Sequence, residues 1–170
     1  MEIDGLNSDP DRVGYSSVYN GGNYQKKVKI LDSTLREGEQ SPGVSFTTKQ
    51  RLQIGWMLDY FAMYHSVSDI HLKYKLKVSR EQALQRTVEV VEYAKSHGLG
   101  VRVTLEDASR ADPAFTRSFA RSIYEAGADR ISVPDTVGAM RPAGMYRLVS
   151  NIREAVQIPI DVHCHNDLGL

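Results

Sequence analysis

The alternation of short apolar strands with amphipathic helices most limits what this chain can fold into. Strands are predicted at residues 27–32, 100–105, 130–133 and 158–162, and helices at 47–61, 80–97, 113–126 and 142–156. Strands that alternate with helices through short loops are typical of βα units, which build a parallel sheet covered by helices. The sequence therefore predicts an α/β fold with a parallel sheet.

The starts of two helices are marked by capping boxes. In each, a Ser or Thr is followed three residues later by Gln, and the pairs are Thr47–Gln50 and Ser79–Gln82. No clear element is predicted for residues 62–77, which follow a helix without a Gly or Pro stop. Residues 1–26 are rich in Gly, Ser, Asn and Asp and are expected to form a flexible leader. Residues 27–170 are expected to form one domain.

The charge balance limits the classes of partner. The chain has 21 Lys and Arg residues against 21 Asp and Glu residues, so no excess of positive charge favours a nucleic acid or an anionic membrane surface. No apolar run approaches the length of a membrane span, and the N-terminus lacks the layout of a signal peptide. The single cysteine, Cys164, excludes an intrachain disulfide and favours a reducing cytosol. A cytoplasmic protein is expected.

A polar cluster follows each predicted strand. The clusters are Arg36-Glu37, Glu106-Asp107, Asp135-Thr136 and the run from His163 to Asp167. In parallel sheets of this class, ligands bind at the carboxyl ends of the strands. The four clusters are therefore expected to converge on one rim.

His163 and His165 are the clearest candidate metal ligands. They lie two residues apart on an extended segment, so both imidazoles should point to one face. Two imidazoles and one carboxylate form a set that suits Zn, Mn, Co or Fe, and Glu37 is the carboxylate that we nominate. A polar strand end without a metal is the alternative for this dipeptide. Cys164, between the histidines, should point the opposite way and serve as a small core residue.

Several charged residues have both a binding and a structural interpretation. Arg36 could bind a carboxylate or a developing oxyanion through its rigid fork of donors, or it could form a surface ion pair with Glu37 or Glu39. Arg102 alternates with Thr104 and Glu106 on one strand face. An arginine in that setting is either part of a structural ion pair or a substrate clamp.

Two further stretches also stay open at this point. Residues 135–138 have the composition of a helix-capping turn, and spacing alone favours that interpretation over a binding role. The run Lys73–Lys77 is basic and aromatic. It could face an anionic ligand such as a coenzyme phosphate, but a solvated loop before a helix is favoured.

Four motifs together resemble one known family. They are DSTLREGEQ at residues 32–40, EDASR at 106–110, DTVG at 135–138 and HCHND at 163–167. In this order they resemble the DRE-TIM metallolyases, and within these the homocitrate synthase and 2-isopropylmalate synthase group. The resemblance implies a TIM (β/α)8 barrel, here partial, with a divalent metal (Mg, Mn, Zn or Co) at its C-terminal mouth. It also implies a cytoplasmic enzyme that is a homodimer at full length.

The resemblance implies a reaction and a role for each matching residue. The reaction is a Claisen condensation of acetyl-CoA with a 2-oxo acid, followed by thioester hydrolysis. Glu37, His163 and His165 would be metal ligands, and Arg36 would polarise the ketone. The residues that would contact or support the 2-oxo acid are Gln40, Arg102, Thr104, Glu106 and Thr136.

The branch of the family is read from two features. The Glu after Arg36 and the Arg-x-Thr-x-Glu pattern at residues 102–106 look more like homocitrate synthase, which implies 2-oxoglutarate as substrate and lysine biosynthesis through aminoadipate. The 2-isopropylmalate synthase branch, which uses 2-oxoisovalerate, is the alternative. A non-catalytic remnant of the fold is a further one.

The chain departs from the family pattern in length. A full barrel needs eight βα units in roughly 250 residues. Near Met63-Tyr64 roughly 50 to 60 residues, about two βα units, are expected to be absent. Activity of this piece alone is therefore an open question.

Overall fold

The structure is a computed structural model of the 170-residue chain, and it describes residues 42–47, 49–50, 54 and 60–169. The expected leader at residues 1–26 and the expected strand at 27–32 lie outside the described residues. Among the described residues, no helix has the length and apolar character that crossing a bilayer requires.

Four parallel strands form one sheet. They are β1 (Tyr60–Ser66), β2 (Gly100–Glu106), β3 (Arg130–Asp135) and β4 (Ile160–Cys164), and they lie in the order β1-β2-β3-β4. The order in space equals the order along the chain, which is the arrangement of consecutive βα units in a barrel. The predicted parallel α/β fold is confirmed.

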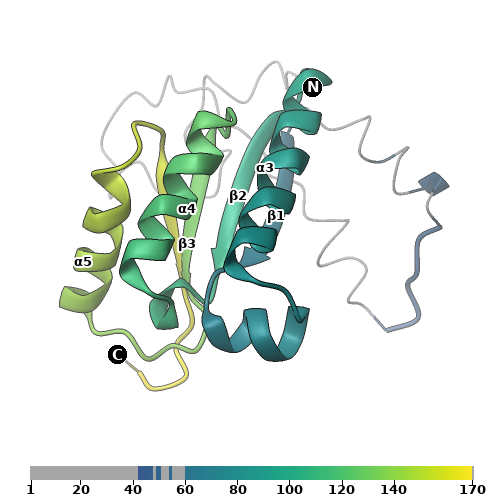
Figure 1. Ribbon diagram of the computed structural model, residues 1–170. Coiled ribbons are helices and arrows are strands. Elements are labelled where there is room, and N and C mark those ends of the chain that lie inside the picture. The colour runs from purple at the N-terminus through teal and green to yellow at the C-terminus, as the bar shows by residue number, and fades with distance from the viewer. Residues whose placement is uncertain (1–41, 48, 51–53, 55–59, 170) are drawn as a thin grey trace, which may run out of the picture.

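Three helices connect the strands and cover one face of the sheet (Figure 1). They are α3 (Arg80–Ser96), α4 (Pro113–Glu125) and α5 (Pro142–Arg153). Two shorter elements follow β1 and β2. They are the π-helix η3 (His71–Leu76) and the 3-10 turn η4 (Ala108–Arg110).

The alternation of side chains in β2 separates a core face from a polar face. Val101, Val103 and Leu105 are completely buried in the core cluster that also includes Phe119 and Ile123 of α4. Each buried side chain of this size contributes about 1.5–3 kcal/mol through removal of apolar surface from water. The residues between them, which include Arg102, Thr104 and Glu106, point to the opposite face.

The register carries this polar face across the whole sheet. Ser66 lies beside Glu106, and Thr104 lies beside Ser132, which in turn lies beside Asp161. Because residues at the same register level of a pleated sheet share a face, these side chains form one polar surface opposite the helices.

Both predicted capping boxes are present. The backbone N–H of Gln82 donates to Oγ of Ser79 at 3.1 Å, and the Ser79 N–H donates to Oε1 of Gln82 at 3.0 Å. At the earlier box the corresponding distances between Gln50 and Thr47 are 3.3 Å and 2.9 Å. Each pair satisfies two backbone donors that a helix start leaves free.

The expected helix at 47–61 is wrong at its C-terminal end. Tyr60 and Phe61 begin strand β1, where they pair with Gly100 and Val101 of β2. Phe61 packs against the core in this strand. Non-local pairing with β2 therefore overrides the local helical pattern. The expected loop at Lys73–Lys77 is also wrong, because most of it belongs to η3.

Cys164 is exposed, so its expected place in the core is wrong. It lies on the helix side of β4, as its position between two histidines suggested. Val162 on the same side is 53% exposed. Among the described residues, nothing covers this end of β4, and a residue that points toward the helix layer is buried only where a helix is present.

Candidate functional site

The carboxyl ends of the four strands lie at one edge of the sheet because the strands are parallel. The segments that follow them are η3, η4, the turn at residues 136–141 and the stretch from His165 to Asp167. Three predicted site residues, Arg36, Glu37 and Gln40, lie outside the described residues. Whether they meet this edge stays a prediction.

Glu106, the last residue of β2, is the centre of a hydrogen-bonded cluster. Lys75 of η3 donates to its two carboxylate oxygens at 2.7 Å and 2.8 Å, and the Ser66 hydroxyl donates to Oε2. Nδ1 of His71 lies 3.3 Å from that hydroxyl and 3.9 Å from Oε2. Two elements that are distant in sequence thus fix the orientation of one carboxylate.

The same contacts determine the charge state of Glu106. Burial raises the pKa of its carboxyl group, but hydrogen bonds from Lys75 and Ser66 outweigh that effect, so the pKa lies below the usual range for glutamate. At neutral pH the carboxylate is ionised. It is therefore an acceptor of hydrogen bonds, not a donor.

Asp107 is a buried anchor beneath this cluster. It is fully buried, it accepts a hydrogen bond from Ser68, and Nε of Arg110 donates to Oδ1 at 2.8 Å. Its backbone has a φ of 63°, a left-handed conformation that Asp and Asn tolerate better than most residues. Nε2 of His71 lies 3.7 Å from Oδ2 of Asp107, so the imidazole lies between the two carboxylates.

Arg102 is the centre of a second cluster, in the middle of the polar face. Its Nε and Nη2 donate to the two carboxylate oxygens of Asp161 at 3.2 Å and 2.6 Å. Nη2 also donates to Ser132 at 2.7 Å, and Nη1 donates to Thr104 at 3.2 Å. The predicted neighbours Arg102 and Thr104 are therefore in contact. The carboxylate partner of Arg102 is Asp161, whereas Glu106 on its own strand pairs with Lys75.

Both charges in this second cluster are stabilised. Burial raises the pKa of Asp161, but hydrogen bonds from Arg102 and Ser132 outweigh it and hold the pKa below its usual range. Burial lowers the pKa of Arg102, and the hydrogen bonds to Asp161 more than compensate. The pair is ionised at neutral pH.

Thr136 ties the loops after β2 and β3 together. Its hydroxyl oxygen accepts a hydrogen bond from the backbone N–H of Asp107 at 2.9 Å, so its own proton is free to be donated elsewhere. Asp135 accepts from the backbone N–H of Met140 at 2.7 Å, which closes the turn before α5. The turn is present, but α5 begins at the N-cap Arg141 without a side-chain cap, so the helix-capping role considered for this stretch is wrong. The turn leaves a binding role for the Thr136 hydroxyl open.

Gly138 brings that turn against the segment after β4. A Cβ at this position would lie 2.8 Å from the backbone nitrogen of Asp167 and 2.9 Å from the carbonyl oxygen of His165. Gly138 also has a φ of +63°, which glycine adopts without strain. The close approach places the turn after β3 beside the two histidines.

His163 and His165 present two imidazoles on one side of their segment. The ring centroids are 5.0 Å apart, and both side chains are exposed. This donor pair fits a divalent metal, with Glu37 as the further ligand that we predict. Within the described ranges, no three His, Cys, Asp or Glu side chains form a group that could hold a metal ion. The complete ligand set therefore stays a prediction.

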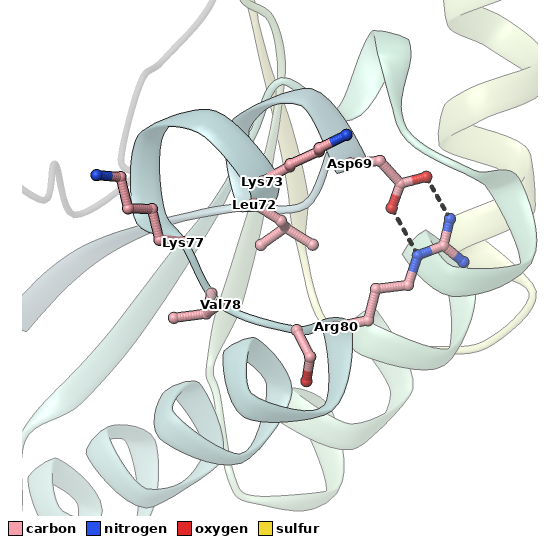
Figure 2. Close-up of a pocket in the computed structure, with 7 residues that line it drawn as sticks. Asp69, Leu72, Lys73, Lys77, Val78 and Arg80 are labelled. Carbon is pink, nitrogen blue, oxygen red and sulfur yellow. Dashed lines mark hydrogen bonds and ion pairs between the residues drawn. The ribbon is translucent and has the colours of Figure 1, made fainter.

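A pocket of about 440 Å³ lies between η3 and the start of α3 (Figure 2). Leu72 and Val78 line it. Figure 2 shows the side chains of Lys73 and Lys77 extending away from Leu72, and Arg80 facing Asp69. Nε and Nη2 of Arg80 donate to the two Asp69 oxygens at 2.7 Å and 2.6 Å, so this arginine is already neutralised.

Residues of these clusters that sequence reasoning missed include Ser66, Lys75 and Asp161. One signal could have found Lys75, since His71 and Lys75 are four residues apart in a run without Gly or Pro, and helical spacing brings such residues together. No comparable signal exists for Asp161, which meets Arg102 only through the strand register.

The chain is similar to curated proteins of two named kinds. It is 37% identical over 198 residues to a probable 2-isopropylmalate synthase of Methanopyrus kandleri, with 85% of this chain and 40% of the relative covered. It is 38% identical over 203 residues to a homocitrate synthase of Saccharolobus solfataricus, with 85% and 44% covered. It is 35% identical over 198 residues to the homocitrate synthase AksA of M. kandleri, with 85% and 50% covered. The chain thus spans half or less of the length of these relatives.

Each alignment contains more positions than the number of residues of this chain that it covers. Since 85% of 170 residues is about 145 residues, an alignment over 198 positions leaves about 50 positions of the relative without a counterpart here. That number agrees with the expected absence of roughly two βα units. The place of the gap near Met63-Tyr64 stays a prediction.

Solved structures support the fold. The hydroxymethylglutaryl-CoA lyase of Brucella melitensis has a TM-score of 0.63 at 18% identity, with 71% of this chain and 46% of that chain covered. The corresponding lyase of Pseudomonas aeruginosa has a TM-score of 0.60 at 22% identity, with 76% and 48% covered. These neighbours are TIM barrels, so the four described strands correspond to part of a barrel.

A family match covers most of the described residues. The HMGL-like family matches residues 60–170, which is more than half of the chain. The match includes three of the four motifs, at 106–110, 135–138 and 163–167, and the curated relatives exceed 30% identity over 85% of the chain. The chain therefore belongs to the HMGL-like family, the DRE-TIM metallolyases.

Proposed function

We propose that this chain carries part of the active site of an acyltransferase that condenses acetyl-CoA with a 2-oxo acid. The observation that carries the proposal is the pair of adjacent imidazoles, His163 and His165, on the sheet edge that also holds Glu106 and Thr136. The names of the curated relatives support the same reaction class.

The proposed reaction is a condensation followed by hydrolysis of a thioester. A base removes a proton from the methyl group of acetyl-CoA, and the carbanion attacks the ketone carbon of the 2-oxo acid. A carbon–carbon bond forms, and the ketone oxygen becomes an alkoxide that is then protonated. Water cleaves the thioester and releases CoA with a new carboxylate.

Each residue has a proposed role in this reaction. His163 and His165, with Glu37, would hold a divalent metal, which supplies Lewis-acid polarisation of the ketone when bound. Arg36 would stabilise the alkoxide electrostatically, and Gln40 would support the pocket.

The residues on the described polar face would bind the 2-oxo acid. The Thr136 hydroxyl has a free proton to donate to the substrate. Glu106 is held ionised by Lys75, so it would accept a hydrogen bond from the hydroxyl that forms when the alkoxide is protonated. Thr104 is the proposed contact deeper on this face, and Arg102 beside it is held by Asp161.

Two 2-oxo acids are candidates, and each is supported by a specific feature. The Arg-x-Thr-x-Glu pattern at residues 102–106 favours 2-oxoglutarate, as in a homocitrate synthase. The engagement of Arg102 by Asp161 favours an uncharged side chain, as in 2-oxoisovalerate, the substrate of a 2-isopropylmalate synthase.

A non-catalytic module is the alternative from another class of function. The observation that favours it is the length, because about 50 positions of the relatives have no counterpart inside this chain. A module that keeps the metal ligands would still bind metal but would not release CoA.

Titration with Mn²⁺ or Zn²⁺ by calorimetry tests the metal part of the proposal. Saturable binding with one ion per chain is expected, and Glu37→Ala and His163→Ala should each weaken it at least ten-fold. His97→Ala is the matched control, because His97 is exposed at the end of α3, where it contacts Tyr93. Unchanged affinity in the first two variants would refute the ligand assignment.

A further inference from the structure

Arg102 and Asp161 form a bridge across three strands of the polar face. Arg102 lies on β2, Asp161 on β4, and Ser132 of β3 lies between them. The side chain of Arg102 is 12% exposed and that of Asp161 is 29% exposed. The two-point contact between guanidinium and carboxylate is the geometry that arginine also uses to bind a carboxylate ligand.

The donors of Arg102 are almost fully used. A guanidinium has five N–H groups. Two donate to Asp161, one donates to Ser132 and one donates to Thr104. Tyr64 is a further hydrogen-bonding partner of Arg102. No adjacent pair of N–H groups is left that could bind a second carboxylate in the same way.

Asp161 balances the positive charge of the arginines around it. Nη1 of Arg130 lies 3.8 Å from Oδ1 of Asp161, so two guanidinium groups face one carboxylate. Removal of that carboxylate would leave two cations on this part of the polar face without an anionic partner among the described residues. A ligand carboxylate is the natural replacement, whereas an uncharged ligand group is not.

We propose that Asp161 is a specificity-determining residue that competes with the distal carboxylate of a dicarboxylic 2-oxo acid for Arg102. The inference deepens the proposed function and rests on it, since it assumes that the 2-oxo acid binds on this face. With Asp161 in place, the site selects a 2-oxo acid with an uncharged side chain. Without it, the site accepts a five-carbon dicarboxylate.

The first test observes Arg102 directly and needs no catalysis. The Nε–H signal of Arg102 in a ¹⁵N NMR spectrum, assigned with Arg102→Lys, is followed during titration with glutarate and, separately, with isovalerate. In the unmodified chain neither acid should shift the signal. In Asp161→Asn, glutarate should shift it saturably and isovalerate should not.

The controls separate the competition from a purely structural ion pair. Asp161→Glu keeps the carboxylate and should behave as the unmodified chain does. Glu154→Gln makes the same charge change as Asp161→Asn at an exposed ion pair with Arg117, and should leave the Arg102 signal unresponsive. A shift of the Arg102 signal by glutarate in the unmodified chain would overturn the proposal. This measurement does not depend on the folding of any variant. The proposal would also be overturned if glutarate left the Arg102 signal unshifted in an Asp161→Asn variant that retains the spectrum of a folded protein.

The second test measures selectivity through CoA release with 2-oxoglutarate and with 2-oxoisovalerate. Asp161→Asn should raise the ratio of the two kcat/KM values, 2-oxoglutarate over 2-oxoisovalerate, at least ten-fold. An unchanged ratio would overturn the specificity role. Absence of CoA release with every 2-oxo acid would instead count against the proposed function, and the glutarate titration would then decide the competition at Arg102.

Discussion

Lys75 and Glu106 are 31 residues apart in the chain, yet Nζ of Lys75 lies 2.7 Å and 2.8 Å from the two oxygens of the Glu106 carboxylate. The lysine comes from η3 and the glutamate from the end of β2. Their contact joins the two βα loops that follow β1 and β2. It also fixes the charge and orientation of a carboxylate on the proposed substrate face.

Replacement of this lysine should change the titration of Glu106. In Lys75→Met the strongest stabilising partner of the carboxylate is lost, so the pKa of Glu106 should rise toward or above its usual range. A ¹³C NMR titration of the Glu106 carboxyl carbon measures this shift. Lys73→Met is the matched control, because Lys73 is also an exposed lysine of η3 but packs over the ring of Tyr74. Equal pKa values in Lys75→Met and the unmodified chain would contradict the account.

The same pair predicts a pH dependence of stability. Because the folded-state pKa of Glu106 lies below its unfolded value, its contribution is fully present above about pH 5 and is lost as the pH falls through the lowered pKa. Lys75 is half exposed, so the contribution at neutral pH should not exceed about 1 kcal/mol. Urea unfolding of Lys75→Met and of the unmodified chain should differ at pH 7 and converge near pH 3. A difference that grows on acidification would exclude this explanation.

Asp107 should be more important for stability than any exposed ion pair. In Asp107→Asn the buried Ser68 and the guanidinium of Arg110 lose their charged acceptor, which should cost about 1–3 kcal/mol of unfolding free energy. Asn tolerates the left-handed backbone, so strain adds little. Asp69→Asn, which breaks an exposed pair with Arg80, should cost at most about 1 kcal/mol. Equal costs in denaturant unfolding would show that Asp107 is not an anchor.

Substitutions at two neighbouring residues of β2 should have different effects, one mainly on stability and the other mainly on activity. Leu105 is buried beneath the helices, and Leu105→Ala should cost about 2–5 kcal/mol of unfolding free energy. Thr104 points to the polar face, where it accepts a hydrogen bond from Arg102, and Thr104→Ala should cost only about 1 kcal/mol. Its effect should instead appear as a raised KM for the 2-oxo acid. A larger loss of stability in Thr104→Ala than in Leu105→Ala would contradict the assignment of the two faces.

Features that depend on local sequence were predictable. The capping box at Ser79 has the expected hydrogen bonds, and the alternation in β2 correctly put Arg102, Thr104 and Glu106 on one face. For the three clusters within the described residues, the expectation that polar clusters meet at one edge also holds, because parallel strands bring their carboxyl ends together. Short-range periodicity and capping chemistry carry this information.

Features that depend on distant pairing were not predictable. Arg102 and Asp161 are 59 residues apart, and only the register of three strands shows that they meet. Tyr60 belongs to β1 and not to the preceding helix, because pairing with β2 decides its conformation. The side chain of Cys164 points in the predicted direction but is exposed and not buried. Burial depends on which elements pack against the strand, and these are distant in sequence.

CoA release measures whether this chain carries the proposed metal-dependent condensation site. The chain is incubated with acetyl-CoA, Mn²⁺ or Zn²⁺, and either 2-oxoglutarate or 2-oxoisovalerate, and free thiol is measured over time. We expect CoA release that requires both the metal and a 2-oxo acid, and that falls at least 100-fold, about 2.7 kcal/mol, in Glu37→Ala and in His163→Ala. Metal binding without CoA release with either 2-oxo acid, or release that is unchanged in these variants, would contradict the account.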